Sequence, residues 1–483
     1  MNDHRGFESV IGLEVHAQLL TRSKIFCGCP TAFGATPNSH VCPVCLGHPG
    51  ALPVLNRAAV EHAVRFGLAI GCRINQRSVF ARKNYFYPDL PKGYQISQFD
   101  RPLCEHGQLV VDVDGQPRPI GIIRVHLEED AGKNLHQGSD PSRSYVDYNR
   151  AGVPLAEIVS APDLRSPAEA VAYLRELRAI LIYLESCDGN MQEGSFRCDA
   201  NVSVRPVGQS ALGTRTELKN INSFKFVAQA LEHEIERQID VLADGGQVEQ
   251  ETRLWDEEAH RTRPMRGKEE SHDYRYFPDP DLLPLVVDDG WLERLRRERP
   301  LLPADRRARL QGELGLPAPD VAMLVEDKAL GDYFEAALSR CPGNPRAVAN
   351  WVVNDVQALV KNAVGGAAAC PVAPDALGAL IGLVDAGVVA SAGARQVFFE
   401  LAAGRASDPA VAARALGVEL VDDSAALAAA VDQVIASSGA EVDKYRAGKK
   451  QVIGYLVGQV LRRLGGKVDP KQVNELLRRR LDA

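Results

Sequence analysis

Residues 10–20 read VIGLEVHAQLL, and apolar and polar side chains alternate along this stretch. Successive side chains of a β-strand point to opposite faces, so the alternation predicts a strand with one buried and one open face. The face that we expect to be buried carries Ile11, Leu13, Val15, Ala17 and Leu19. The open face carries Glu14, His16 and Gln18.

Three further stretches alternate in the same way. In residues 122–130 we expect one buried face and one polar face, made respectively by Ile123, Val125 and Leu127 and by Arg124, His126 and Glu128. Residues 197–205 turn Asp199, Asn201, Ser203 and Arg205 outward, and residues 215–219 carry Arg215, Glu217 and Lys219 on one side. Four such strands are typical of an antiparallel sheet with one open face. Helical spacing covers 166–186, 224–244 and much of 300–405.

The acids on these open faces have two interpretations. One is an ordinary solvated sheet face. The other is a site for Mg²⁺, which binds a few carboxylates and keeps waters that phosphate oxygens can replace. Glu14, Glu128 and Asp199 suit such a site, with His16 and Asn201 as further ligands. Neither a G-x-x-x-x-G-K-[ST] nor a G-x-G-x-x-G motif is present, so a glycine-rich phosphate loop is not expected.

Four cysteines gather near the N-terminus as Cys27-Gly28-Cys29 and Cys42-Pro43-Val44-Cys45. Two close pairs separated by a turn-rich loop predict a structural Cys₄ zinc site. Unmetallated thiols are the alternative. A zinc hydrolase is not favoured, because four thiolates leave no open metal position and the chain has no H-E-x-x-H motif.

Charge is distributed unevenly along the 483 residues, whose net charge is −7. Residues 444–480 hold eleven Lys and Arg against two acids, a balance of +9, which leaves −16 for the rest. This asymmetry predicts a nucleic-acid-binding appendage on an acidic body. No apolar run is long enough to span a bilayer and the N-terminus is polar, so we expect a cytoplasmic protein with no membrane association.

Prolines divide the chain. The Pro300–Pro303 stretch and the Asp408-Pro409 pair predict boundaries, since the residue before a proline is disfavoured in a helix. We therefore expect a catalytic domain at 1–295 with the cysteine cluster inside it, a helical domain at 296–405, and a helical tail at 409–483.

Long motifs resemble one known family, the B subunits of bacterial Asp/Glu-tRNA(Asn/Gln) amidotransferases. The resemblance covers essentially the whole chain. It includes FESVIGLEVHAQLLTRSKIF at 7–26, RKNYFYPDLPKGYQISQFD at 82–100, HLEEDAGK at 126–133, DYNRAGVPLAEIVSAPDLRS at 147–166, EGSFRCDANVSVR at 193–205, MRGKEESHDYRYFPDPDLLP at 265–284 and the tail at 448–481.

The resemblance implies an α+β fold. Its catalytic cradle is an antiparallel sheet related to glutamine synthetase and guanidino kinases, followed by a helical domain and a YqeY-like tail. It implies ATP-dependent, Mg²⁺-dependent amidation of Glu-tRNA(Gln), Asp-tRNA(Asn) or both through an acyl phosphate. The family's glutaminase (the A chain of the complex) would supply ammonia, and a small C chain would complete a heterotrimer. A further candidate partner is the misacylating synthetase. The alternative is a non-catalytic tRNA-binding scaffold.

Site residues follow from the motifs. The resemblance implies that Glu14, His16, Glu128 and Glu157 are catalytic and hold Mg²⁺, with Asp199 and Asn201 as additional candidates. Candidates for binding ATP or the tRNA 3′ end are Lys83, Tyr85, Lys92, Lys133, Arg215, Lys219, Arg266, Lys268 and Arg275. Candidates for gripping tRNA in the tail are Lys449, Lys450, Arg462, Arg463, Lys467, Arg478 and Arg479. Residues 208–213 look expanded relative to the family, at a place that we expect to be remote from the site.

Overall fold

A nine-stranded sheet forms the centre of the first of two compact units, residues 1–303. The computed structural model describes residues 5–135, 144–265, 274–363, 365–420, 424–464, 468 and 470–482. The strand order is β14-β13-β12-β11-β1-β10-β7-β6-β2. The bounds are β1 Phe7–Gln18, β2 Arg73–Ile74, β6 Cys104–Val113, β7 Gln116–Glu129, β10 Pro154–Ser160, β11 Phe196–Pro206, β12 Thr216–Lys219, β13 Thr252–Asp256 and β14 Arg261–Pro264. Among the described strands only β12 and β13 pair in parallel, so the expected antiparallel character is confirmed for the rest of the sheet.

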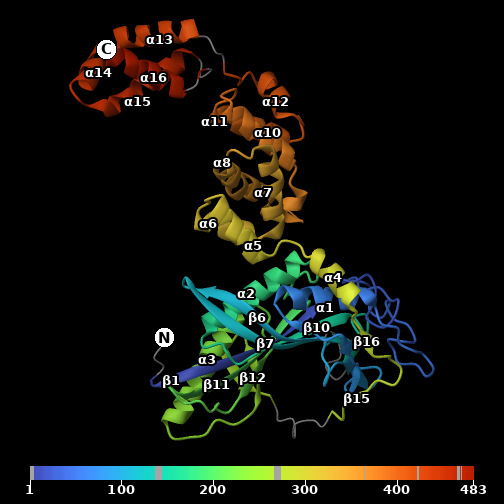
Figure 1. Cartoon of the computed structure of the whole chain (residues 1–483). Helices are drawn as coiled ribbons and strands as arrows, with labels where there is room; N and C mark the ends of the chain where they lie inside the picture. Colours follow the sequence, from blue (N-terminus) through green and yellow to red (C-terminus); the bar gives the residue numbers. More distant parts are fainter. Residues whose placement is uncertain are drawn as a thin grey trace. The chain divides into compact units, whose positions relative to one another are not determined.

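Helices cover one face of the sheet (Figure 1), and the segment Tyr94–Ser97 covers part of the other face at β7, where Ser97 Oγ donates to Glu128. Helices α1 (Arg57–Ala69), α2 (Pro167–Tyr183) and α3 (Phe224–Ala243) pack against β6, β7 and β11. The apolar face of β1 is buried beneath them as the alternation predicts, with Ile11, Val15 and Ala17 fully inaccessible. Smaller pairings surround this sheet: β3 (Arg77–Ser78) with β16 (Leu285–Val286), β8 (Lys133–Leu135) with β9 (Tyr145–Asp147), and β4 (Ala81–Asn84) between β5 (Tyr94–Ser97) and β15 (Phe277–Pro278).

A register shift corrects one expectation about β7. Val159 of β10 lies opposite Arg124, but the next residue, Ser160, lies opposite Ile122. The extra residue, Ile123, is therefore turned out of the alternation, as happens at a β-bulge. Ile122 enters the core in its place, whereas Ile123 is 44% exposed, so the predicted burial of Ile123 is wrong.

The second compact unit, residues 304–483, contains two separate hydrophobic cores. One is built on α6 (Ala318–Glu326), α7 (Lys328–Arg340), α8 (Pro345–Asn350), α10 (Pro374–Asp385), α11 (Ser391–Ala402) and α12 (Pro409–Leu416). The other is built on α13 (Ser424–Ser437), α14 (Gly439–Arg446), α15 (Ile453–Arg463) and α16 (Pro470–Leu481), which we call the tail module. In the tail module Ile453, Leu456 and Val460 are buried, whereas Tyr455 is 53% exposed. None of the described helices has the length and apolar character needed to cross a membrane.

The first unit ends at Pro303, within the Pro300–Pro303 stretch, whereas the Asp408-Pro409 pair lies inside one of the helical cores. Helix α4 (Asp289–Arg297) and Leu302 pack in the first core, so residue 295 lies inside a helix rather than at a boundary. Asp408 caps the N-terminus of α12 by accepting hydrogen bonds from Ala410 N and Val411 N, and Pro409 occupies the first turn. This pair is thus a helix start. Because Ala412 and Ala413 are buried in the core of α6–α12, the tail module begins after Leu420.

This division predicts the outcome of truncation. A chain ending at Asp408 should be less stable than one ending at Leu420 by about 4 kcal/mol, since it loses the burial of five side-chain carbons of Pro409, Ala412 and Ala413 at about 0.8 kcal/mol each. Thermal unfolding of both truncations, compared with the full chain, measures the difference. Equal stability of the two truncations would show that the tail module begins directly after Asp408.

Candidate active site

The register of four neighbouring strands aligns a row of charged side chains on the open face. His16 of β1 lies opposite Arg197 of β11 on one side and opposite Glu157 of β10 on the other. Glu157 in turn lies opposite His126 of β7. Directly opposed residues share a face of the sheet, so all four side chains stand next to one another.

Two imidazoles and two carboxylates form a compact cluster in this row. His16 Nε2 lies 3.4 Å from Glu157 Oε2 and 3.6 Å from Glu128 Oε1. His126 Nε2 lies 3.4 Å from Glu157 Oε2 and 3.7 Å from Glu128 Oε2. Glu128 and Glu157 are buried although both are acids, and buried charges require partners. We call these four residues the acid–histidine cluster.

Electrostatics in the cluster favour an ionised Glu157. Burial opposes ionisation of Glu157, but His126 and His16 hold its pKa well below the ordinary value. Burial likewise opposes protonation of His126, yet Glu157 and Glu128 raise its pKa to about 9. Glu157 therefore attracts positive charge, which either protonated imidazoles or a metal cation can supply.

The cluster can hold a hard divalent cation. Ligand atoms of His16, Glu128 and Glu157 lie within 4.8 Å of one another. Two carboxylates and an imidazole leave positions open for water or phosphate oxygens, which is how Mg²⁺ is usually bound. These are three of the four ligands expected from the sequence.

Glu14, the fourth expected ligand, stands apart from the other three. Its Oε1 accepts a hydrogen bond from Asn201 Nδ2 at 3.1 Å. Burial raises the pKa of Glu14, and the neighbouring acids Glu157, Glu217 and Asp199 raise it further. Asp199 is paired with Lys219 Nζ at 2.9 Å, which makes it a poorer metal ligand than expected.

Arg197 and Asp130 are functional candidates that the sequence did not single out. Arg197 donates from both terminal nitrogens to the two carboxylate oxygens of Asp130, at 3.0 and 3.1 Å. Gln18 Nε2 donates to the same carboxylate at 2.8 Å. Asp130 is 4% exposed, so these two parallel hydrogen bonds fix the guanidinium of Arg197 beside His16. His126 was expected on the polar face but not in the site. Only strand register, which alternation does not reveal, brings these residues together.

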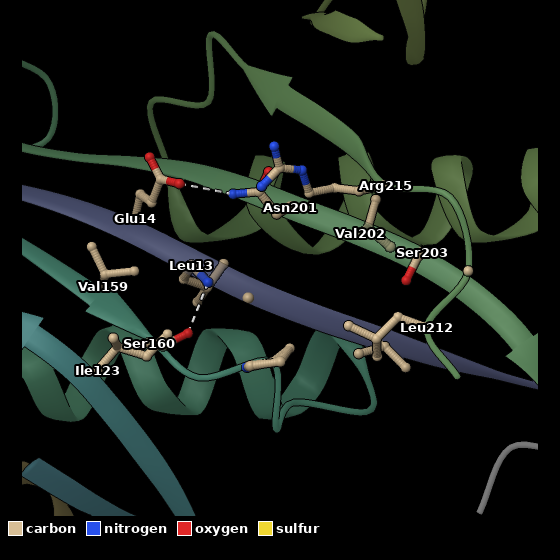
Figure 2. Close-up of a pocket in the computed structure, with 14 residues that line it drawn as sticks. Leu13, Glu14, Ile123, Val159, Ser160, Asn201, Val202, Ser203, Leu212 and Arg215 are labelled. Carbon is tan, nitrogen blue, oxygen red and sulfur yellow. Dashed lines mark hydrogen bonds between the residues drawn. The ribbon is translucent and has the colours of Figure 1, made fainter. Parts of the chain in front are cut away.

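The expected basic ligands fall into distinct groups. Lys83 points toward the cluster: it lies 4.8 Å from the Tyr274 ring and 5.8 Å from that of Tyr85. Burial opposes its charge, but Glu128 raises its pKa. Lys92 Nζ instead forms an ion pair with Glu129 Oε1 at 2.5 Å. Lys133 and Arg275 are exposed, and Lys219 bridges Asp199 and Glu217. Arg215 lines a cavity of the sheet together with Glu14 and Asn201 (Figure 2). Leu212 and Gly213 line it too, so the expectation that residues 208–213 are remote from the site is wrong. Arg266 and Lys268 lie outside the described residues.

The four cysteines also come together. Sγ atoms of Cys27, Cys29, Cys42 and Cys45 lie within 4.8 Å of one another. Cys42 N donates to Cys45 Sγ at 3.2 Å, and the buried Lys24 Nζ lies 3.6 Å from the same sulfur. Hydrogen-bond and ammonium donors stabilise thiolates, which are the form that binds Zn²⁺. The donor set therefore fits a closed, structural zinc site.

Residues 9–293, which include the sheet and the acid–histidine cluster, match the family model described as the GatB/GatE catalytic domain. A second family model, described as the GatB domain, covers residues 332–481. Relatives that are B subunits of aspartyl/glutamyl-tRNA(Asn/Gln) amidotransferase match almost end to end. The protein of Syntrophotalea carbinolica is 54% identical over 98% of both chains, and that of Anaeromyxobacter sp. strain Fw109-5 is 56% identical over 98% of this chain and 99% of its own. This chain belongs to the family of aspartyl/glutamyl-tRNA(Asn/Gln) amidotransferase B subunits.

The cysteine geometry predicts about one zinc per chain. Replacing Cys27 and Cys45 together by serine should lower zinc content and the unfolding temperature in parallel, because both thiolates are removed from the site. Elemental analysis and thermal unfolding of unchelated protein measure the two effects. Cys370→Ser, at a similarly half-buried cysteine outside the cluster, is the matched control. Zinc retained by the double variant would contradict the assignment.

Proposed function

We propose that this chain activates misacylated tRNA with ATP and amidates it, acting on Glu-tRNA(Gln), Asp-tRNA(Asn) or both. The observation that carries the proposal is the acid–histidine cluster on an open sheet, found in a chain that belongs to a family of amidotransferase B subunits. The enzyme is then a ligase that forms a C–N bond. The relationship of the sheet to glutamine synthetase and guanidino kinases remains a prediction.

The proposed reaction has two steps. The γ-phosphoryl group of ATP passes to the side-chain carboxylate of the aminoacyl group, giving an acyl phosphate and ADP. Ammonia then attacks the acyl carbon, phosphate leaves with the bonding electrons, and the nitrogen loses a proton to give the amide. A free carboxylate is a poor acylating agent, so phosphorylation supplies the leaving group. No protein nucleophile is required.

Residues of the cluster have distinct proposed roles. Glu128, Glu157 and His16 would hold Mg²⁺. When bound, Mg²⁺ offsets charge on the phosphoryl oxygens and orients them for in-line transfer. Arg197, fixed by Asp130, and Lys83 would contribute fixed positive charge to the phosphates, which is worth most where water is excluded.

A scaffold that only binds tRNA is the competing function. The basic tail fits such a role. The acid–histidine cluster does not, because buried carboxylates repel RNA phosphates unless a cation intervenes. ATP hydrolysis or transfer that depends on misacylated tRNA distinguishes the two functions.

The proposed partners are tRNA and the other two chains of the amidotransferase, A and C. The A chain would release ammonia from glutamine, and the C chain would complete the heterotrimer. In the tail module the exposed side chains of Lys449, Arg462, Arg463, Arg478 and Arg479 suit phosphate contacts. Lys450 is paired with Asp482 at 2.6 Å, which weakens its candidacy, and Lys467 lies outside the described residues.

The cluster makes a sharp prediction for one carboxylate. Glu128→Gln should reduce ATP-dependent amidation by at least about 100-fold, on the order of 3 kcal/mol, because a metal ligand is removed where charge develops. Glutamine hydrolysis in the assembled complex should persist. The control is Glu8→Gln. Glu8 is a carboxylate of β1 that is paired with Arg205, and its variant should amidate normally. Near-normal amidation by Glu128→Gln would remove this carboxylate from the site.

The tail module makes a second prediction. Truncation after Leu420 should weaken binding of cognate tRNA in the assembled complex. The slope of log affinity against log salt should become shallower by roughly 0.7–0.9 for each phosphate that the tail no longer neutralises. The acidic remainder of the chain repels RNA, so affinity must come from local positive surfaces. Unchanged affinity with an unchanged salt slope would show that the tail does not grip tRNA.

A further inference from the structure

Lys24 is a buried lysine that the proposed reaction does not use. The residue is 1% exposed, whereas lysine is almost never fully buried unless it is paired. Its Nζ donates to His40 O at 2.8 Å and to Tyr148 O at 3.2 Å, and it lies 3.6 Å from Cys45 Sγ. Within the described part of the chain these three groups are its polar partners, and none of them is a carboxylate. The positive charge of Lys24 is therefore not balanced by an ordinary ion pair.

The contacts of Lys24 complete its hydrogen bonds and leave its charge to one partner. An ammonium has three N–H donors, and the three partners can accept all of them. Two partners are backbone carbonyls, which orient the ammonium but carry no net charge. A buried charge is costly unless an opposite charge lies beside it. Cys45 Sγ, as a thiolate, is the partner that can supply this opposite charge.

The cysteine site carries the complementary charge when zinc is bound. Four thiolates hold twice the charge of one Zn²⁺, so the filled site is an anion. The four Sγ atoms lie within 4.8 Å of one another, which concentrates this charge. Cys45 is the buried member of the four, so salt and water screen its sulfur least. The ammonium of Lys24 thus stands beside the thiolate that most needs a counter-charge.

The backbone makes room for this contact at Gly152. Its φ of +86° lies in the left-handed region, which favours glycine. A Cβ built there would lie 3.4 Å from Lys24 Cδ and 3.7 Å from Cys45 Cβ, so the lysine stem and Cys45 pack against the same glycine. Through Tyr148 O the ammonium also holds the start of the segment from Tyr148 to Val153, which backbone hydrogen bonds join to Asp130.

We propose that Lys24 is the counter-charge of the zinc site: its ammonium lies against Cys45 and raises the affinity of the four cysteines for zinc. The inference goes beyond the proposed function and does not depend on it, because it concerns zinc binding and neither ATP nor tRNA. It rests on the assignment of the four cysteines to zinc. The competing role is purely structural, in which Lys24 only joins the carbonyls of His40 and Tyr148.

Two substitutions at Lys24 test the role of its charge in zinc binding. Lys24→Met keeps the bulk of the stem but removes both the charge and the donors. Lys24→Gln removes the charge and keeps N–H donors for the carbonyls. Groups that support metal ligands typically contribute about 10–100-fold to metal affinity, so each variant should weaken zinc binding by about tenfold or more. Zinc affinity is measured on the full-length chain by competition with a chelator.

Arg22→Gln is the matched control. Arg22 is a nearby cation that is exposed to solvent, so its loss should change zinc affinity by less than about twofold. An unchanged zinc affinity in Lys24→Gln would overturn the counter-charge. An equal loss in Arg22→Gln would overturn it too, because any positive charge in this part of the chain would then have the same effect. If Lys24→Met does not fold, the comparison of Lys24→Gln with Arg22→Gln still decides.

Stability with and without the cysteines gives a second, independent test. In the zinc-loaded chain Lys24→Gln should lower the unfolding temperature, because the anionic site loses its counter-charge. In a Cys27→Ser, Cys45→Ser double variant the same substitution should raise the unfolding temperature, because Lys24 is there a buried charge with no opposite charge beside it. A purely structural role predicts a lower unfolding temperature in both backgrounds, and that result would overturn the proposal.

The zinc content of the unmodified protein is the remaining arm of the experiment. The proposal expects zinc in the full-length chain purified without chelator. A full-length chain that binds no added zinc would overturn the counter-charge role and would leave the proposed function standing.

Discussion

The antiparallel register of β1 with β10 and β11 is the constraint on which the site depends. Side chains alternate along a strand with a period of two, so a slip of one residue would turn His16 into the core and Val15 onto the open face. The apolar face of β1 prevents such a slip, since Ile11, Val15 and Ala17 are fully buried against the helices. The hydrophobic effect thus fixes not only the fold but also which strand neighbours oppose His16. Arg197 and Glu157 stand beside it for that reason.

The acids gathered by this register would destabilise the sheet if they were left unpaired. Their repulsion is offset within the row: His16 and His126 flank Glu157, Arg197 is held by Asp130, and Lys219 neutralises Asp199. The two histidines therefore offset the negative charge of Glu157, and a cation bound in the cluster would do the same.

Local patterns in the sequence predicted what local physics determines. Alternation identified the faces of β1 and β11, and close spacing identified the four cysteines. Alternation does not reveal long-range pairing, so it does not place His126, Arg197 and Asp130 beside His16. It also does not separate Glu14 from His16, Glu128 and Glu157, whose ligand atoms lie within 4.8 Å of one another. Ile123 was misplaced because a bulge depends on the partner strand, β10. The Asp408-Pro409 pair does not by itself distinguish a domain boundary from a helix start, because both have the same local signal, whereas burial of Ala412 depends on distant helices.

The cysteine cluster and the acid–histidine cluster are joined through backbone contacts, which gives the proposed zinc site a reason to be present. Lys24, beside Cys45, donates to Tyr148 O, and Ile25 N donates to Gly152 O. Gly152 N donates to Asp130 O, and Asp130 N donates to Val153 O. Asp130 is the residue that holds Arg197. A metal that fixes the cysteine loop therefore also limits movement of the segment from Tyr148 to Val153, which leads directly into β10. The zinc site would act as a brace: its loss would loosen the positions of Asp130 and Glu157 without removing any group that contacts substrate.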